Sequence, residues 1–249
     1  MVMISTLDRF LGSLLGSYMG FHYRQPEWPA LHSDPLYTAW IKPPLLELQC
    51  TSNGYAPLPW LLYRYDNSTI RHHELAKHLE HLSVEAADPD AMTTLSTLYI
   101  LGDSLEWLMQ CPLSSQQALP QLLEYLQQQQ VDYPSTLHGF ALFGTPLASN
   151  LSKPDNAHSA ALNVALEQSL NHRENLALAL NSSMPRFTRT MLGCLLGAWG
   201  GISVIPTSWM LLLAPEVKQA ITLLASQLYQ SWAGISSAQG TLETFPLDL

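Results

Sequence analysis

Two ten-residue stretches decide the fold: residues 11–20, LGSLLGSYMG, and residues 192–201, LGCLLGAWGG. Each repeats glycine every four residues, a spacing that places the glycines on one face of a helix. Glycine inside a helix costs about 1 kcal/mol relative to alanine, so the repeat indicates either a close neighbour on this face or, alternatively, direct contact with a ligand. We expect two helices that pack against each other at the centre of the fold. The glycines are Gly12, Gly16 and Gly20, and Gly193, Gly197 and Gly201.

Helical periodicity continues through the rest of the chain, which lacks the regular alternation of strands. The sequence therefore predicts an all-α fold, formed as a single domain over residues 1–249. The proline-rich residues 26–44 are expected to form a long ordered loop. Helices are expected over residues 6–19, 55–65, 70–82, 91–109, 115–130, 137–147, 157–170, 173–181, 187–200, 208–213 and 215–233.

Composition limits the partners and the location. The formal net charge is −9, with eleven Lys and Arg residues, so neither a nucleic acid nor an anionic membrane surface is expected as a partner. The three cysteines show no CxxC spacing, which is typical of free thiols and predicts a cytoplasmic protein. The uncharged residues 190–215 are long enough to span a membrane, but Gly200, Gly201 and Pro206 interrupt them. We expect a buried helix, a turn and a second helix there instead.

A more specific pattern follows the second glycine stretch. Residues 193–198, GCLLGA, fit Gly-x-x-x-Gly-Ala, and residues 205–209, IPTSW, fit Ile-Pro-x-x-Trp. Together with residues 11–20, these segments resemble the ADP-ribosylglycohydrolase family, which includes enzymes that remove ADP-ribose from modified proteins. The resemblance runs nearly the full length of the chain. It implies a helical hydrolase fold in which aspartates hold two magnesium ions.

The acidic residues that this resemblance implies are replaced here. Counted along the family's motifs, no aspartate remains at the five expected positions. The degenerate pocket positions are Ser17 in Gly-Asp-x-x-Gly; Thr51, Ser52 and Asn53 in the Thr-Asp-Asp-Thr turn; Met184, Arg186 and Phe187 in Asp-x-Asp-Thr; and Arg24, where some members carry a glutamate that acts on the substrate.

These replacements change the expected function. Magnesium prefers anionic carboxylate ligands; serine, asparagine and methionine cannot bind it strongly, and an arginine repels the ion. We expect a pseudoenzyme with no metal, no cofactor and no catalytic residue, which acts by binding a protein partner or a nucleotide-like ligand. Arg186 either attracts a phosphate or carboxylate group or reaches into solvent. The aromatic residues beside these positions either stack on a ligand or pack in the core: Tyr18, His22, Tyr23 and Tyr55.

Two alternatives stay open. In the first, the protein is an active N-glycosidic hydrolase with relocated carboxylates, drawing on Asp34, Asp66 or Asp103. In the second, it is a structural subunit whose pocket is filled by Met184 and Phe187.

Two further patterns are weak. Residues 102–105 spell Gly-Asp-Ser-Leu, the signature of an esterase family, but inside a helical segment and without a partner triad, so we interpret the match as chance. Glu74, His78 and His81 share one helical face and could bind a transition metal, but with Lys77 and Glu80 beside them we interpret this face as an exposed polar surface.

Overall fold

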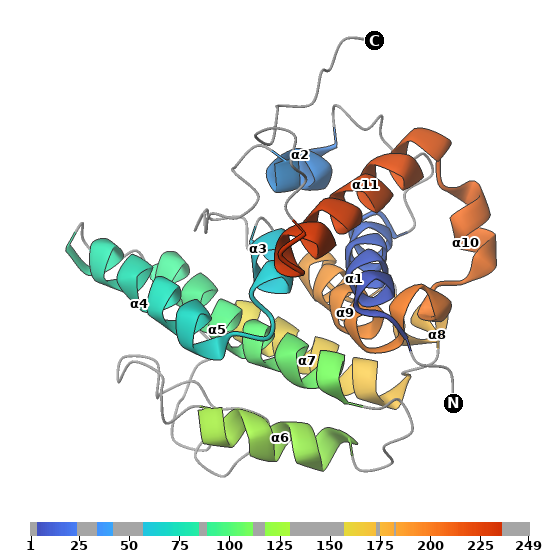
Figure 1. Ribbon diagram of the computed structural model, residues 1–249. Coiled ribbons are helices and arrows are strands. Elements are labelled where there is room, and N and C mark those ends of the chain that lie inside the picture. Colours follow the sequence, from blue (N-terminus) through green and yellow to red (C-terminus); the bar gives the residue numbers. More distant parts are fainter. Residues whose placement is uncertain are drawn as a thin grey trace.

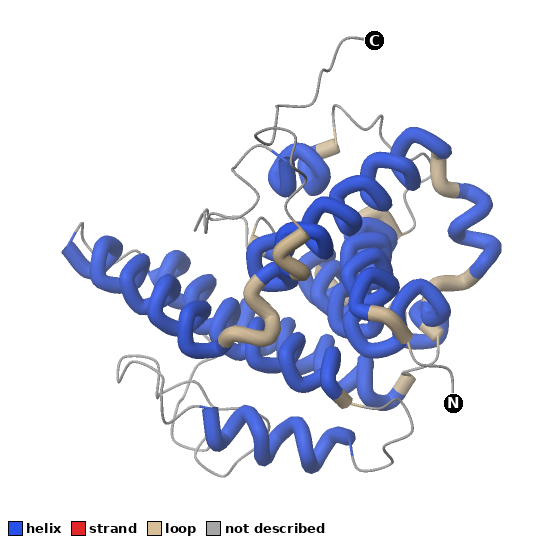
Figure 2. The backbone as a smooth tube through the Cα atoms, viewed as in Figure 1, coloured by secondary structure: helices blue, strands red, loops and turns tan. Residues whose placement is uncertain are grey.

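The computed structural model describes residues 4–23, 34–41, 57–84, 89–111, 118–129, 157–172, 175–181 and 183–235. Over these ranges the chain contains helices and no strand, as Figure 2 shows, so the all-α prediction is confirmed. The elements are α1 (Thr6–Phe21), α2 (Pro35–Ile41), α3 (Leu58–Tyr63), α4 (Ser68–Val84), α5 (Pro89–Gln110), α6 (Ala118–Gln129), α7 (Ala157–Asn171), α8 (Leu176–Ala179), α9 (Arg186–Gly200), a 3-10 turn (Gly201–Val204), α10 (Thr207–Leu212) and α11 (Pro215–Trp232).

The two glycine helices, α1 and α9, lie side by side at the centre (Figure 1). A Cβ atom added at Gly16 would stand closer than 3.0 Å to the backbone of Gly193, and one added at Gly193 would meet the backbone of Gly16 equally closely. A Cβ added at Gly197 would meet the backbone of Gly12 in the same way, and one added at Gly20 would meet the carbonyl group of Arg189. The glycines therefore let two backbones touch, which confirms the structural explanation of the repeat.

The other helices build the core around this pair. The helix α11 crosses α1, while α7 and α5 pack on α9, and α4 lies along α5 (Figure 1). Where α1, α3 and α11 meet, the rings of Phe10, Tyr65 and Trp232 have centroids 5.7 to 6.3 Å apart. Edge and tilted contacts of this kind add to the stability gained by burying the rings.

Three arginines hold the ends of helices together. The last carbonyl groups of a helix lack partners within it, and a guanidinium group supplies several donors at once. Each of these side chains donates to carbonyl oxygens near the end of another helix. The bonds are Arg9 Nη1 to Leu108 and Ala198 (2.8 and 2.9 Å), Arg71 Nη1 to Arg64 and Tyr65 (2.9 and 3.0 Å), and Arg189 Nε to Gly20 (3.3 Å).

Most predicted helices match the structure, and two predictions were wrong. Residues 35–41 form α2 rather than loop, because Pro35 occupies the first helical position, where a missing N–H costs nothing. The helix predicted over 173–181 is reduced to α8. The helix predicted over 137–147 lies outside the described residues. Residues 190–215 form helix, turn and helix as expected, and no helix in the described ranges is long and apolar enough to cross a membrane.

Candidate functional site

The candidate site lies where α1 ends and α9 begins. Ser17 is fully buried in the contact between these helices, beside the thiol of Cys194. Burial raises the pKa of this thiol to about 12, and a hydrogen bond with Ser17 offsets part of the rise. Ser17 therefore belongs to the helix packing and does not face an open cleft.

The start of α9 carries the second set of predicted residues. Arg186 is exposed, and its guanidinium carbon lies 4.8 Å from the centroid of the Phe21 ring at the end of α1. This distance is within the range of a cation–π contact. Met184 and Phe187 are half-buried and pack on the hydrophobic core. One exposed cation thus stands beside two side chains that fill space.

The aromatic residues at the end of α1 separate into two groups. Tyr18 and His22 are buried, with ring centroids 4.5 Å apart. Tyr23 is half-exposed, and its ring centroid lies 5.8 Å from that of Trp209 in α10. The guanidinium of Arg189 lies 5.8 Å from the Tyr23 ring. The structure thus gathers Ser17, Tyr18, His22, Tyr23, Met184, Arg186 and Phe187 at one end of the α1–α9 pair, while Arg24, Thr51, Ser52, Asn53 and Tyr55 lie outside the described residues.

This donor set does not fit two magnesium ions. Of the five positions where aspartates are implied, the structure describes Ser17, Met184 and Arg186, which offer a buried hydroxyl, a thioether and a cation. Magnesium requires several oxygen ligands in an octahedral arrangement. Within the described part of the chain, no three His, Cys, Asp or Glu residues gather so that they could hold a metal ion.

The three acids of the hydrolase alternative have separate partners. Asp34 contacts His22, and Asp66 accepts a hydrogen bond from Trp232 Nε1 at 2.9 Å. Asp103 pairs with Arg71 in the packing of α4 on α5. A hydrolase with relocated acids needs several carboxylates that converge on one cleft. The three contacts place these carboxylates on different helix pairs.

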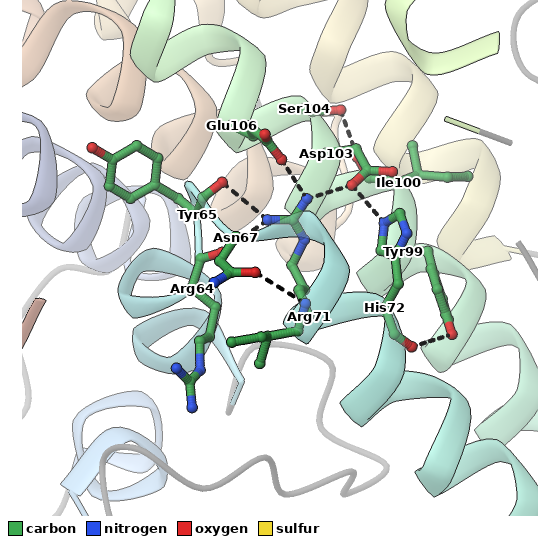
Figure 3. Close-up of polar contacts among 11 residues, drawn as sticks. Arg64, Tyr65, Asn67, Arg71, His72, Tyr99, Ile100, Asp103, Ser104 and Glu106 are labelled. Atoms are coloured by element: carbon green, nitrogen blue, oxygen red, sulfur yellow. Dashed lines mark hydrogen bonds and ion pairs between the residues drawn. The ribbon is translucent and has the colours of Figure 1, made fainter. Parts of the chain in front are cut away.

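Asp103 and Ser104 of the Gly-Asp-Ser-Leu signature belong to a buried polar cluster between α4 and α5, drawn in Figure 3. Arg71 Nη2 contacts the carboxylates of Asp103 and, at 2.8 Å, Glu106. His72 Nε2 lies 2.8 Å from Asp103 on its other side (Figure 3). Ser104 is buried, and its hydroxyl donates a hydrogen bond to the carbonyl of Ile100 in the same helix at 2.6 Å. It is therefore not placed as the nucleophile of an esterase, which must be open to the substrate.

Electrostatics hold this cluster together. Burial acts to lower the pKa of Arg71, but the neighbouring carboxylates, Asp103 first, raise it above its ordinary value. Its guanidinium therefore remains charged inside the protein. A Cβ added at Gly102 would stand 2.6 Å from Arg71 Nε, so the glycine of the signature makes room for this arginine.

The helix face weighed as a metal site begins with Glu74, and the carboxylate of Glu74 binds other side chains. Glu74 accepts hydrogen bonds from Trp60 Nε1 at 3.0 Å and from Arg64 Nη2 at 3.2 Å. Its carboxylate thus ties α4 to α3. The side chain of His81 is not among those described.

Sequence reasoning missed the contact between Asp34 and His22. His22 Nε2 lies 2.6 Å from Asp34 Oδ2, and both side chains are almost completely buried. They are twelve positions apart, and the intervening stretch has no periodic pattern that predicts the pairing. One local signal was present: Asp before Pro is typical of a helix start.

Stability in acid should report this contact. Burial acts to raise the pKa of Asp34, but hydrogen bonds from His22, the Tyr37 backbone and Tyr18 hold it below its ordinary 3.8. A carboxyl group with a lowered pKa stabilises the fold above its unfolded-state pKa and loses this contribution as pH falls through the folded-state pKa. Urea unfolding from about pH 5 to pH 3 should therefore show a smaller loss of stability in Asp34→Asn than in the wild type. Equal losses would contradict this role.

Comparisons with family models, curated proteins and solved structures give no match. The resemblance to the ADP-ribosylglycohydrolases thus depends on the sequence motifs alone.

Proposed function

We propose that this protein is a metal-free, non-catalytic ADP-ribosylglycohydrolase-like protein that acts by binding a nucleotide-like ligand. The observation that carries the proposal is the position of Arg186, an exposed cation stacked on Phe21 where the resemblance implies a metal ligand. A guanidinium group binds phosphate through paired hydrogen bonds, so it can replace the attraction of a metal ion without supplying a reactive water.

Three further features support an anionic, aromatic ligand. Arg186 and Arg189 are three residues apart on α9, so their side chains share a helix face. Their positive charges lie near the N-terminus of α9, where the helix dipole also favours an anion. The half-exposed ring of Tyr23 stands beside Arg189 and contacts the ring of Trp209, and a base could stack on these rings.

A protein partner is the second candidate. The short helix α10 has no buried residue, and the side chains of Leu211 and Leu212 are 82% and 70% exposed. A partner that covered these two leucines would remove their apolar surface from water. This surface begins next to Trp209, so a partner could contact it together with the arginine face.

A thermal-shift series tests the proposal. We expect ADP-ribose to raise the melting temperature, because a ligand that binds only the folded state stabilises it by about 2.7 kcal/mol at one hundred times its Kd. Mg²⁺ should cause no shift. Arg186→Ala should lose most of the ADP-ribose shift, while Lys77→Ala, which removes an exposed cation on α4, should keep it.

Three outcomes decide between the candidates. Magnesium-dependent release of ADP-ribose from modified Arg or Ser substrates would contradict the proposal and favour the hydrolase. A shift by ADP-ribose that Arg186→Ala does not change would place the ligand elsewhere. Absence of both turnover and any nucleotide shift would leave the protein-partner role.

A further inference from the structure

A buried carboxylate joins α1 to α2. Asp34 is fully buried, and its Oδ1 accepts hydrogen bonds from the backbone N–H groups of Leu36 and Tyr37, at 2.9 and 3.0 Å. Its Oδ2 lies 2.6 Å from His22 Nε2, and the buried Tyr18 hydroxyl interacts electrostatically with the same carboxyl group. Side-chain donors from α1 and backbone donors from α2 thus converge on one anion.

The groups around Asp34 favour its charged form. Burying a charge is costly unless hydrogen bonds or opposite charges compensate. Here His22, the Tyr37 backbone and Tyr18 do so, and the pKa of Asp34 stays below its ordinary value despite burial. Burial, reinforced by the charge of Asp34, raises the pKa of Tyr18, so its hydroxyl keeps the proton that it donates.

The two α1 donors form one half of an oxyanion site. Tyr18 and His22 are four residues apart, so their side chains lie on the same helix face. Both are buried, and Asp34 lies against them. An oxyanion from solvent cannot reach them while Asp34 is in place.

The element that carries Asp34 depends on the same contact. The helix α2 has seven residues, and isolated helices below about 12 residues are marginal in water. Its Leu36, Tyr37 and Trp40 side chains are buried, and its first N–H groups are capped by Asp34. Loss of the carboxylate therefore removes both the cap of α2 and its polar attachment to α1.

We propose that Asp34 is an autoinhibitory latch: its carboxylate occupies from within the chain an oxyanion site formed by Tyr18 and His22, which an external phosphate or carboxylate can enter only when α2 moves away. The inference rests on the proposed function for the identity of the ligand, since the site adjoins Phe21 and thus the Arg186 face. The test of the latch uses no nucleotide, so the latch and the proposed function can fail separately.

The latch is tested by removing the Asp34 carboxylate and supplying a small carboxylate from solution in its place. Asp34→Ala should melt at a lower temperature than the wild type, and formate or acetate should raise its melting temperature by about 2 to 4 °C relative to chloride at equal ionic strength. The wild type and Asp66→Ala, which removes an exposed carboxylate, should show no such preference. This comparison removes the general effect of salts on folding. A response of Asp34→Ala no larger than that of Asp66→Ala overturns the latch.

A second variant decides the matter if Asp34→Ala does not fold. Asp34→Asn keeps the shape of the side chain, and hydrogen exchange followed by mass spectrometry reports each helix separately. We expect residues 35–41 to exchange about tenfold faster or more, the effect of losing a helix cap and a buried charge, while residues 186–200 keep their protection. Unchanged exchange in α2, or equal loss of protection in α9, overturns the proposal.

Discussion

Replacing Gly193 with alanine is expected to destabilise the protein by about 3 kcal/mol or more, the upper part of the range for overpacked cores. The new Cβ would overlap the backbone of Gly16, and backbone atoms inside a helix cannot turn aside as a side chain can. The helices α1 and α9 must then separate, which opens gaps along their whole contact. Urea unfolding followed by circular dichroism measures the loss.

A second glycine provides the control for this prediction. Gly234 follows α11 with φ of +68°, and nothing lies within 4 Å of the position of its added Cβ. Gly234→Ala should cost only the strain of the left-handed conformation, about 1 to 2 kcal/mol. Alanine also favours the helix by about 1 kcal/mol at Gly193, so the measured loss there understates the steric effect. A smaller loss for Gly193→Ala than for Gly234→Ala would contradict the backbone contact.

Replacing Arg71 with methionine is expected to cost about 3 to 5 kcal/mol, because it leaves buried carboxylates without their cation. Arg71 and Asp103 are both fully buried, and Arg71 also contacts Glu106 and the end of α3 (Figure 3). Urea unfolding followed by circular dichroism measures this loss as well. Lys77→Met, an exposed cation on the same helix, should change stability by about 0.5 kcal/mol or less.

A double variant separates charge from packing at this cluster. If the cost of Arg71→Met comes from the unpaired charge, then Asp103→Leu in the same protein should restore part of the stability, since apolar replacements of buried ion pairs are often well tolerated. If Asp103→Leu adds its own loss in full, then the cluster is stabilised by shape and hydrogen bonds rather than by charge pairing.

Helix patterning explains why much of the fold could be predicted. The glycine repeats at 12, 16, 20 and at 193, 197, 201 indicate a close neighbour on one helix face, and in the structure this neighbour is the backbone of the other glycine helix. The residues Leu14, Leu15, Leu195 and Leu196 beside them are fully buried, as the apolar runs predict. Local spacing is thus sufficient where the interaction follows one helix face.

The polar contacts could not be predicted in this way. Arg71 and Asp103 meet across 32 positions, and the sequence shows only a charged residue in each of two helices. The partner of Asp34 depends on where a proline-rich segment returns to α1, which no periodicity specifies. For the candidate site, motif spacing predicted a grouping of Ser17 with Arg186, and the structure places both at one end of the α1–α9 pair; what they bind stays a proposal.

The contact between α1 and α9 also has a consequence for synthesis of the protein. The helix α1 is synthesised about 180 residues before its main partner α9, an interval that takes about 10 to 35 s to translate at 5 to 20 residues per second. Until then, the part of α1 that packs on α9 has no native cover. The α1–α9 pair can therefore form completely only after residue 200 has emerged.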